Sequence, residues 1–554
     1  MMAIGGSLKR VASILCGASL FWGVAGPGHC AGRPNILLIL VDDMGYSDLG
    51  SYGGEIYTQN IDELAAQGFR FTNFHTSAFC APTRSMLLTG QDNHKAGLGN
   101  MSELLADNQR GQPGYEGFLN GQPTIAALLR ADGYHTYMAG KWHLGKSADK
   151  LPVAQGFEES VVLAEGGGDN FENKSYTPGY ASLHYYEGAK PIDLPKDFYS
   201  TQFYTDKMLG YIDAHANDGS PFFGYLAFQA VHQPHQAPTD FIERYAHVYD
   251  AGWTAIGDVR RRRQLEIGLL PPGAREPTPA GPDWSALSDD EKRMAAKRMA
   301  VYAGMVEYVD MSVGRIVEHL RAKNLLDDTI ILFLSDNGGE SAELMKMFPD
   351  YYAKNFDLSY ERLGQKGSYS EYGPGWASVS MTPFSNFKGS AAEGGVRAPL
   401  IIRYPQKFAV GRTSGAFLSV ADITPTLLEL AGARAPSADP KAFLGVSMVP
   451  LLTQKADDLR AGATFAQEVA GGAAVYGGDY KLVRNAPPFG DFKWRLYDLK
   501  KDPTESIDLS GQDPQRVDAL RAAYADYVRA NGVVEVPDDY AVDAQLKKNM
   551  QRGK

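Results

Sequence analysis

Short apolar runs that alternate with helical patterns are the feature that most constrains the fold of this chain. Between the runs, residues 61–67 and 124–131 have helical spacing, and a longer helix begins at Ser288, which has capping-box spacing with Glu291. Alternation of this kind is typical of an α/β fold. We therefore predict a large, mixed, mostly parallel sheet flanked by helices. The apolar runs are 36–41, 135–139, 222–228, 329–335 and 400–403.

The alternating pattern changes after about residue 455. Residues 475–484 and 494–499 have the pattern of antiparallel strands. The sequence thus predicts a catalytic domain over 32–455 and a smaller C-terminal α+β domain with an antiparallel sheet over 456–554. The tail after Val536 is polar, and we expect it to be loosely attached. The segments 240–283 and 345–380 lack clear periodicity and are predicted to be long connecting segments outside the sheet.

The first 31 residues have the composition of a signal peptide. Lys9 and Arg10 precede the apolar run 11–25, and small residues follow it. A transmembrane anchor is the alternative, although the run is short for a bilayer span. We expect an exported protein, periplasmic or secreted, without stable membrane insertion after cleavage. Cys16 and Cys30 lie in or beside this segment, so a mature chain would keep only Cys80 and no internal disulfide framework.

The net charge argues against two classes of partner. The 554 residues carry a formal charge of -11 with a pI near 5.6, whereas binding to nucleic acid or to an anionic membrane requires a broad cationic surface. The one basic run, 260–263, is interpreted as a solvated face. Any anionic substrate must therefore be held by local charge.

Polar and charged residues follow four of the apolar runs. The carboxyl ends of parallel strands meet at one edge of a sheet, which is where ligands bind in open α/β folds. Any one of these endings is usually turn chemistry. Four on one edge predict a functional site. The residues are Asp42 and Asp43, Lys141 and His143, His232, and Asp336 and Asn337.

Three carboxylates and an amide oxygen in this set predict a metal ion. Asp42, Asp43 and Asp336 would repel one another unless a cation lay between them. All the donors are hard oxygen atoms, which favours calcium or magnesium over zinc. The number of protein ligands favours calcium, because magnesium tends to keep several waters.

The segment from Cys80 to Gly90 is the most informative in the chain. Pro82 suits the first turn of a helix, so Cys80 would lie at the positive N-terminus and Arg84 one turn along on the same face. An anion bound there would meet backbone N–H groups and a guanidinium together. The alternative is a buried structural cysteine.

This segment, with its Cys-x-Pro-x-Arg pattern, resembles the signature of the formylglycine-dependent sulfatases of the alkaline phosphatase superfamily. Further segments resemble the family in the same order, and the likeness is to bacterial arylsulfatases of the Pseudomonas type. Residues 496–499 with 502–503 also resemble the family's C-terminal domain. The other matching segments are 41–45, 140–145, 335–338, 387–389 and 393–395.

The resemblance implies a cofactor and a maturation partner. Cys80 would be oxidised to formylglycine by a formylglycine-generating enzyme, and its side chain would complete one calcium site. Ala81 stands where the family often has Ser or Thr, but that position is variable. The implied calcium ligands are Asp42, Asp43, Asp336, Asn337 and the converted Cys80.

The resemblance also implies a mechanism for a small-molecule sulfate ester. Formylglycine hydrates to a geminal diol, and one hydroxyl, deprotonated beside calcium, attacks sulfur. His143 would take a proton from the second hydroxyl and so release sulfate. Lys141, Arg84 and Lys388 would offset negative charge on the sulfate oxygens, and either His232 or Lys388 would protonate the departing alcohol.

Other functions remain open at this stage. A phosphodiesterase or phosphonate monoester hydrolase of the same superfamily is the nearest alternative, because the fold does not separate the two. A calcium-binding protein without turnover is the alternative from another class. The remaining histidines that we considered have no motif support and are expected to be structural or to lie at the rim of the site: His75, His94, His135, His184 and His235.

Overall fold

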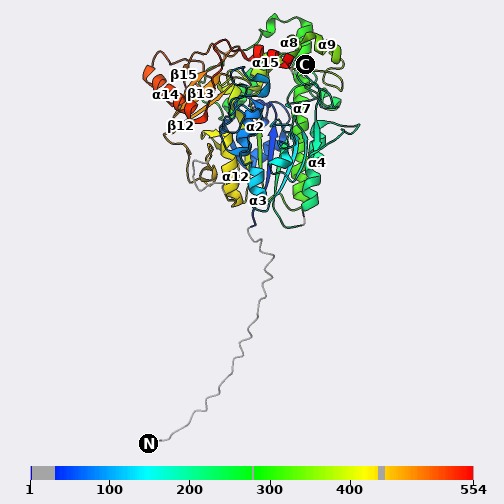
Figure 1. Cartoon of the computed structure of the whole chain (residues 1–554), viewed down its shortest axis with the longest axis vertical. Helices are drawn as coiled ribbons and strands as arrows, with labels where there is room; N and C mark the ends of the chain where they lie inside the picture. Colours follow the sequence, from blue (N-terminus) through cyan, green and yellow to red (C-terminus); the bar gives the residue numbers. More distant parts are fainter. Residues whose placement is uncertain (1, 3–31, 217, 278–279, 435–442, 553–554) are drawn as a thin grey trace. The chain divides into compact units, whose positions relative to one another are not determined.

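The computed structural model describes residue 2 and residues 32–216, 218–277, 280–434 and 443–552 (Figure 1). Residues 34–554 form one compact unit. Apart from Met2, the predicted signal peptide lies outside the described residues, as do Cys16 and Cys30. No helix among the described residues is long and apolar enough to cross a membrane.

A mixed, mostly parallel sheet lies at the centre of this unit (Figure 1). Its strand order is β10-β2-β9-β8-β1-β7-β3-β4-β5-β6, and β11 also pairs with β2. Strands β8, β1, β7, β3 and β4 are parallel neighbours, whereas β9 runs antiparallel to both β8 and β2. The predicted sheet is therefore confirmed. The strands are β1 (Asn35–Val41), β2 (Phe69–His75), β3 (His135–Lys141), β4 (Glu159–Leu163), β5 (Tyr185–Glu187), β6 (Lys190–Pro191), β7 (Phe222–Ala227), β8 (Thr329–Ser335), β9 (Arg397–Arg403), β10 (Arg412–Ser414) and β11 (Leu418–Ser419).

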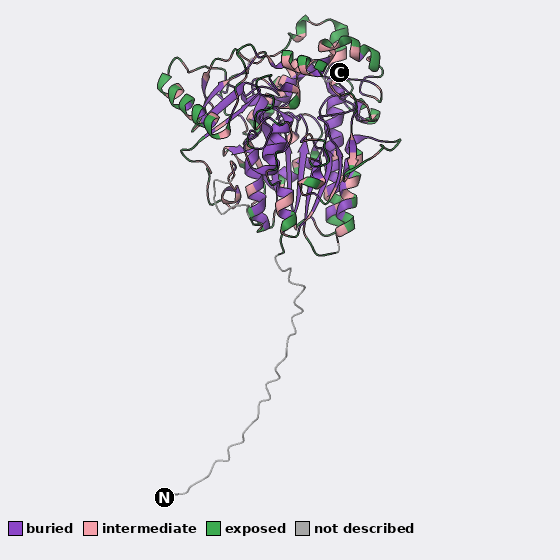
Figure 2. Cartoon of the chain, viewed as in Figure 1, coloured by how far each residue is buried: buried purple, intermediate pink, exposed green. Residues whose placement is uncertain are grey.

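Helices cover both faces of the sheet, which is why its central strands are apolar along their whole length. Leu37 and Ile39 of β1 pack in one core with α1 (Gln59–Ala66), α4 (Ser200–His215) and α7 (Asp289–Ala322). Ile36 and Leu38 pack in a second core with α2 (Cys80–Thr89), α3 (Ile125–Ala131) and α12 (Ile423–Ala431). Figure 2 shows buried residues through the sheet and exposed residues on the outer sides of the helices. The predicted capping box of Ser288 and Glu291 begins α7.

The connecting segments 240–283 and 345–380 contain more helix than their weak periodicity indicated. The basic run lies on α6 (Gly252–Glu266), and its first residue is buried rather than solvated: Arg260 lies 2.6 Å from Asp48 and 2.7 Å from Glu55. The helix was missed because its buried face carries Arg260 and Gln264 in place of an apolar stripe. Before the C-terminal sheet, the other helices among the described residues are α5 (Thr239–Glu243), α8 (Leu344–Met347), α9 (Pro349–Asn355), α10 (Gly373–Ser380), α11 (Glu393–Val396) and α13 (Val449–Leu452). The 3-10 turns there are η1 (Gly50–Tyr52), η2 (Ser102–Leu104), η3 (Pro152–Gln155), η4 (Trp284–Ala286) and η5 (Val420–Asp422).

A smaller antiparallel sheet follows, as the sequence predicts, but the segment 475–484 is two antiparallel strands joined by a turn at Gly478 and Asp479 rather than one strand. Strands β12 (Thr464–Val469), β13 (Gly472–Gly477), β14 (Tyr480–Arg484) and β15 (Arg495–Asp498) pair in chain order, and α14 (Pro514–Asn531) packs against them. The boundary of a separate domain at residue 456 stays a prediction.

The expectation of a loosely attached tail is wrong. Residues 542–552 form α15 (Val542–Arg552), whose Val542 and Met550 are buried. Gln545 donates a hydrogen bond to the carbonyl of Leu105 at 2.8 Å, and Asn549 donates one to the carbonyl of Glu103 at 2.9 Å. The apolar residues Val542, Leu546 and Met550 recur at every fourth position, as on one face of a helix, but the polar residues between them obscured this pattern. The amide contacts to the backbone around η2 leave no sequence pattern.

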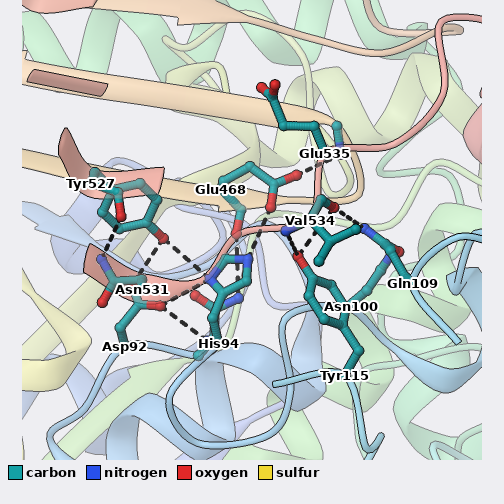
Figure 3. A network of polar contacts seen from close by, with 12 residues as sticks. Asp92, His94, Asn100, Gln109, Tyr115, Glu468, Tyr527, Asn531, Val534 and Glu535 are labelled. Atoms are coloured by element: carbon teal, nitrogen blue, oxygen red, sulfur yellow. Dashed lines mark hydrogen bonds and ion pairs between the residues drawn. The ribbon is translucent and has the colours of Figure 1, made fainter. Parts of the chain in front are cut away.

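A buried ionic network joins the loop after α2 to the C-terminal sheet (Figure 3). His94 lies between Asp92, 2.9 Å from its Nδ1, and Glu468 of β12, 3.0 Å from its Nε2. Tyr527 of α14 donates to Asp92 at 2.9 Å. Burial lowers the pKa of His94, but hydrogen bonds to Asp92 and Glu468 outweigh it and raise the pKa to about 9. His94 is therefore a cation at neutral pH with a structural role.

We predict that His94→Gln lowers the thermal midpoint at pH 7, because it leaves two buried carboxylates without their cation. Loss of one partner from a buried ion pair costs about 3–5 kcal/mol. The folded pKa of about 9 exceeds the unfolded value near 6.5, so this stabilisation is complete below about pH 6.5 and disappears as the pH rises through 9. Thermal unfolding of parent and variant between pH 6 and 10 measures the difference. His319→Gln, which removes an exposed His–Asp213 pair, is the control. A deficit independent of pH would contradict the assignment.

Candidate functional site

The predicted strand-end residues meet at the carboxyl edge of the parallel strands. Asp42 and Asp43 follow β1, Asp336 and Asn337 follow β8, and Lys141 is the last residue of β3. Each is at most 1% exposed. They meet because β8 pairs with β1, and because β7 pairs in parallel with both β1 and β3.

Helix α2 brings Cys80 and Arg84 to the same place. The helix begins at Cys80 as predicted, and no side chain caps its first turn. The Cys80 Sγ lies 3.9 Å from Oδ1 of Asp43. Arg84 contacts Oδ2 of Asp336 through Nε at 3.0 Å and Nη2 at 2.8 Å, and its Nη1 donates to the carbonyl of Lys141 at 2.9 Å. The guanidinium thus compensates a carboxylate of the cluster.

The carboxylate cluster has the chemistry of a site for a hard cation. Ligand atoms of Asp42, Asp43, Cys80 and Asp336 all lie within 4.8 Å of one another. Oδ1 of Asp42 and Oδ1 of Asn337 are buried without a hydrogen-bond partner. Burial, followed by repulsion from Asp336, raises the pKa of Asp42 to about 8. The residues therefore fit a divalent cation, for which the two unpartnered oxygens of Asp42 and Asn337 would serve as ligands.

Two lysines contact the cluster from its sides. Lys141 Nζ lies 2.5 Å from Oδ2 of Asp42, and Lys388 Nζ lies 2.9 Å from Oδ2 of Asp43. Burial favours the neutral form of Asp43, but the positive charges of Lys388 and Lys141 outweigh it and lower its pKa. Burial likewise opposes the charge on Lys388, and Asp43 more than compensates, so the pKa of this lysine is well above its usual value.

Two histidines complete the predicted set. His232 Nδ1 donates to the carbonyl of Gln233 at 2.5 Å, and its Nε2 lies 3.7 Å from Oδ2 of Asp43. Burial lowers the pKa of His232 well below its usual value and also lowers that of His143. Both imidazoles are therefore neutral at neutral pH, with a free nitrogen to accept a proton.

Sequence reasoning missed two glutamates. Glu340, four residues after Asp336, lies 2.9 Å from Lys388 Nζ. Glu103 of η2 lies 3.7 Å from Nε2 of His143 and accepts a hydrogen bond from Tyr180 at 2.7 Å. The position of Glu340 after the Ser-Asp-Asn-Gly segment was the one available signal, and Glu103 lies in no motif that we recognised.

A cavity of about 710 Å³ opens onto these groups. Cys80, His143, His232 and Lys388 line its inner end. Its walls are largely apolar, and α15 supplies part of them, so the C-terminal segment borders the site. The apolar lining residues are Phe79, Met101, Leu104, Tyr176, Leu344, Met347, Phe489, Val542, Leu546 and Met550.

Fold and site together place a buried carboxylate cluster, whose chemistry fits a cation, beside a largely apolar pocket. The sulfatase family model matches residues 34–433, and a model described as N-sulphoglucosamine sulphohydrolase, C-terminal, matches residues 388–523. The chain belongs to the sulfatase family and is a sulfuric ester hydrolase.

Relatives support the same conclusion. An uncharacterized sulfatase of Schizosaccharomyces pombe is 37% identical over 92% of this chain and 96% of its own. An arylsulfatase of Klebsiella aerogenes is 36% identical over 74% of this chain and 89% of its own.

Solved structures share the fold. The crystal structure of Ps i-CgsB in complex with k-i-k-neocarrahexaose has a TM-score of 0.65 at 22% identity, over 94% of this chain and 97% of that chain. A phosphonate monoester hydrolase of Agrobacterium radiobacter has a TM-score of 0.53 at 19% identity, over 90% and 95%. The fold alone therefore does not select between sulfate and phosphonate esters.

Proposed function

We propose that this sulfatase is an exported, calcium-dependent arylsulfatase that uses formylglycine derived from Cys80. The observation that carries the proposal is the position of Cys80, at the uncapped start of α2, beside three carboxylates and at the inner end of an apolar pocket. The N-terminal segment supports export to the periplasm or the medium, and an exported cysteine enzyme of this kind requires a formylglycine-generating enzyme as its maturation partner.

Calcium is the ion that the donor set favours. Asp42, Asp43, Asp336 and Asn337 would hold it, with the converted side chain of residue 80 as a further ligand. Bound there, the ion would lower the pKa of a hydroxyl beside it and offset the charge of the three carboxylates.

The surroundings of Cys80 favour modification over thiol catalysis. Burial raises the pKa of the Cys80 thiol well above its usual value, and a protonated thiol is a poor nucleophile. Hydrated formylglycine supplies two hydroxyl groups on one carbon: one to attack sulfur and a second whose deprotonation expels sulfate.

The two groups left open for leaving-group protonation differ in electrostatics. Lys388 holds its proton tightly because Asp43 raises its pKa, so it is suited to stabilise charge on the sulfate oxygens, together with Lys141. His232 is neutral without substrate, and its Nδ1–H donates to Gln233. The negative charge of a bound sulfate ester would raise its pKa, so that Nε2 takes up a proton from solvent and passes it to the departing alcohol. We therefore assign leaving-group protonation to His232.

His143 is placed to act as the base. Its lowered pKa keeps it neutral, and Glu103 beside its Nε2 would stabilise the imidazolium that forms when it accepts a proton. Glu103 is a positioning residue in this scheme, held by Tyr180 and by the backbone contact of η2 with α15. Arg84 acts through Asp336, which it orients by two hydrogen bonds.

The pocket walls favour an apolar alcohol. Phe79, Tyr176 and Phe489 present aromatic surface near Cys80, and Leu546 and Met550 extend the apolar wall from α15. An aryl group would bury apolar area there, worth roughly 25 cal/mol per Å². The Klebsiella aerogenes relative is named an arylsulfatase, which supports the same substrate class.

Chelation tests the ion. We predict that exhaustive chelation abolishes hydrolysis of 4-nitrophenyl sulfate, that calcium restores it, and that calcium raises the thermal midpoint, since binding to the native state stabilises it. Asp42→Asn should weaken both responses, whereas the exposed Asp250→Asn should match the parent. Full activity without metal would refute the site, and restoration by zinc alone would refute the choice of calcium.

Conversion of Cys80 tests the nucleophile. We predict that peptide mass spectrometry of active enzyme shows an aldehyde or its hydrate at position 80, and that turnover follows the converted fraction in preparations made with and without the maturation enzyme. Unconverted Cys80→Ser should perform at most one turnover, because a single hydroxyl cannot eliminate sulfate. Steady turnover by either unconverted form would rule out the mechanism.

The same converted enzyme decides between the two substrate classes. We expect aryl sulfates to have higher kcat/KM than bis-aryl phosphates or phosphonate monoesters of the same phenol. The reverse order, with aldehyde present at position 80, would make the protein a phosphodiesterase or phosphonate monoester hydrolase on this fold.

A series of aryl sulfates whose phenols differ in pKa distinguishes the role of Lys388 from that of His232. Lys388→Ala should lower turnover of all aryl sulfates by about 100 to 1,000-fold, roughly 3 to 4 kcal/mol. His232→Gln should affect poor leaving groups much more than 4-nitrophenol, because only they need the proton. The steepness of log kcat against the pKa of the phenol measures this. The assignment is reversed if Lys388→Ala steepens the dependence and His232→Gln does not.

A further inference from the structure

A second group of metal-ligand side chains lies at the edge of the sheet opposite to the sulfatase site. His135 begins β3, the strand whose last residue is Lys141, so the two ends lie about 20 Å apart. His215 is the last residue of α4, and Asp218 lies in the connection to β7. Ligand atoms of His135, His215 and Asp218 lie within 4.8 Å of one another.

Each of the two imidazole rings, of His135 and His215, has an inner nitrogen that faces Asp218 and an outer nitrogen that faces a glutamate. On the inner side, Oδ2 of Asp218 lies 2.8 Å from Nε2 of His135 and 3.4 Å from Nδ1 of His215. On the outer side, Glu158 lies 2.9 Å from Nδ1 of His135, and Glu159 lies 2.9 Å from Nε2 of His215. Each of the four ring nitrogens therefore faces a carboxylate.

Two neutral imidazole rings do not carry enough N–H groups to form all four of these hydrogen bonds. A carboxylate only accepts hydrogen bonds, so each nitrogen must carry an N–H, but a neutral imidazole has one. Two neutral rings satisfy two of the four contacts. All four are satisfied only if both rings are imidazolium cations, and the rings of His135 and His215 stack with centroids 4.1 Å apart. Two like charges in that arrangement repel each other, and the three carboxylates around them offset this repulsion only in part.

A divalent metal ion on the inner side removes this conflict. It would bind one nitrogen of each neutral ring and an oxygen of Asp218, while each outer N–H donates to a glutamate. Histidine ligands of metals commonly donate their other N–H to a carboxylate in this way, which fixes the tautomer. Tetrahedral zinc with bonds of about 2.0–2.2 Å needs ligand atoms roughly 3.3–3.6 Å apart. The 3.4 Å between Asp218 and His215 matches this spacing, whereas the 2.8 Å between Asp218 and His135 has to lengthen by about 0.5 Å when the ion binds.

We propose that His135, His215 and Asp218 form a zinc site, with Glu158 and Glu159 orienting the two histidines. Two imidazoles and one carboxylate favour a borderline ion of the zinc class over calcium, which prefers oxygen donors. The side chains of His135 and His215 are 22% and 30% exposed, so an ion has access and water can fill the fourth position. The ion joins the end of α4 to the starts of β3 and β4.

Zinc binding to the calcium-loaded, untagged full-length protein tests the proposal. Equilibrium dialysis with elemental analysis should show one zinc in the parent that is absent from His135→Ala and His215→Ala, and cobalt should give the visible absorption of a tetrahedral site with nitrogen ligands. Calcium in excess keeps the oxygen-rich sulfatase site from binding zinc. Glu158→Gln should retain the ion about 10 to 100-fold more weakly.

Two controls separate this site from surface binding and from the sulfatase site. His319→Ala removes another partly exposed histidine that pairs with an aspartate, and it should bind zinc as the parent does. Hydrolysis of aryl sulfate should be unchanged in His135→Ala, because the residue is remote from Cys80. The exposed Asp218→Asn provides a further test if a histidine variant is misfolded by circular dichroism. Equal zinc in the parent and in folded His135→Ala, His215→Ala or Asp218→Asn would overturn the proposal.

Discussion

Three buried carboxylates that meet at one point are the constraint on which the rest of this structure depends. Asp42, Asp43 and Asp336 are fully buried, and burial of such charges is costly unless each is compensated. The compensating groups come from distant parts of the chain: Arg84 from α2, Lys141 from β3 and Lys388 from the loop before α11. The sheet and α2 must therefore both be in place before the cluster is stable.

The pocket depends on a second set of long-range contacts. Its inner end is built by strand ends and α2, which belong to the sheet, whereas much of its apolar wall comes from late segments such as Phe489 and α15. Helix α15 also holds η2, which carries Glu103 next to His143. Helix α15 thus supports both the surroundings of His143 and the shape of the pocket.

The two edges of the sheet offer different ligand chemistry. At the carboxyl edge the side chains are carboxylates and an amide, compensated by lysine and arginine and excluded from solvent. At the amino edge they are imidazoles paired with carboxylates and partly exposed. Hard oxygen donors suit calcium and nitrogen donors suit zinc, so the two proposed sites would select different ions.

The sequence by itself determined the parallel strands, because their apolar runs are local and continuous. It also determined the residues at their carboxyl ends and the helix that begins at Cys80, since Asp42, Asp336 and Cys80 lie in short motifs. Only the tertiary structure decided which polar groups from distant segments pair. Arg260 is buried against Asp48 and Glu55, α15 holds η2 through amide contacts, and His135 meets His215. Such pairs leave no periodic trace, because each is a single long-range contact that forms once the sheet brings the segments together.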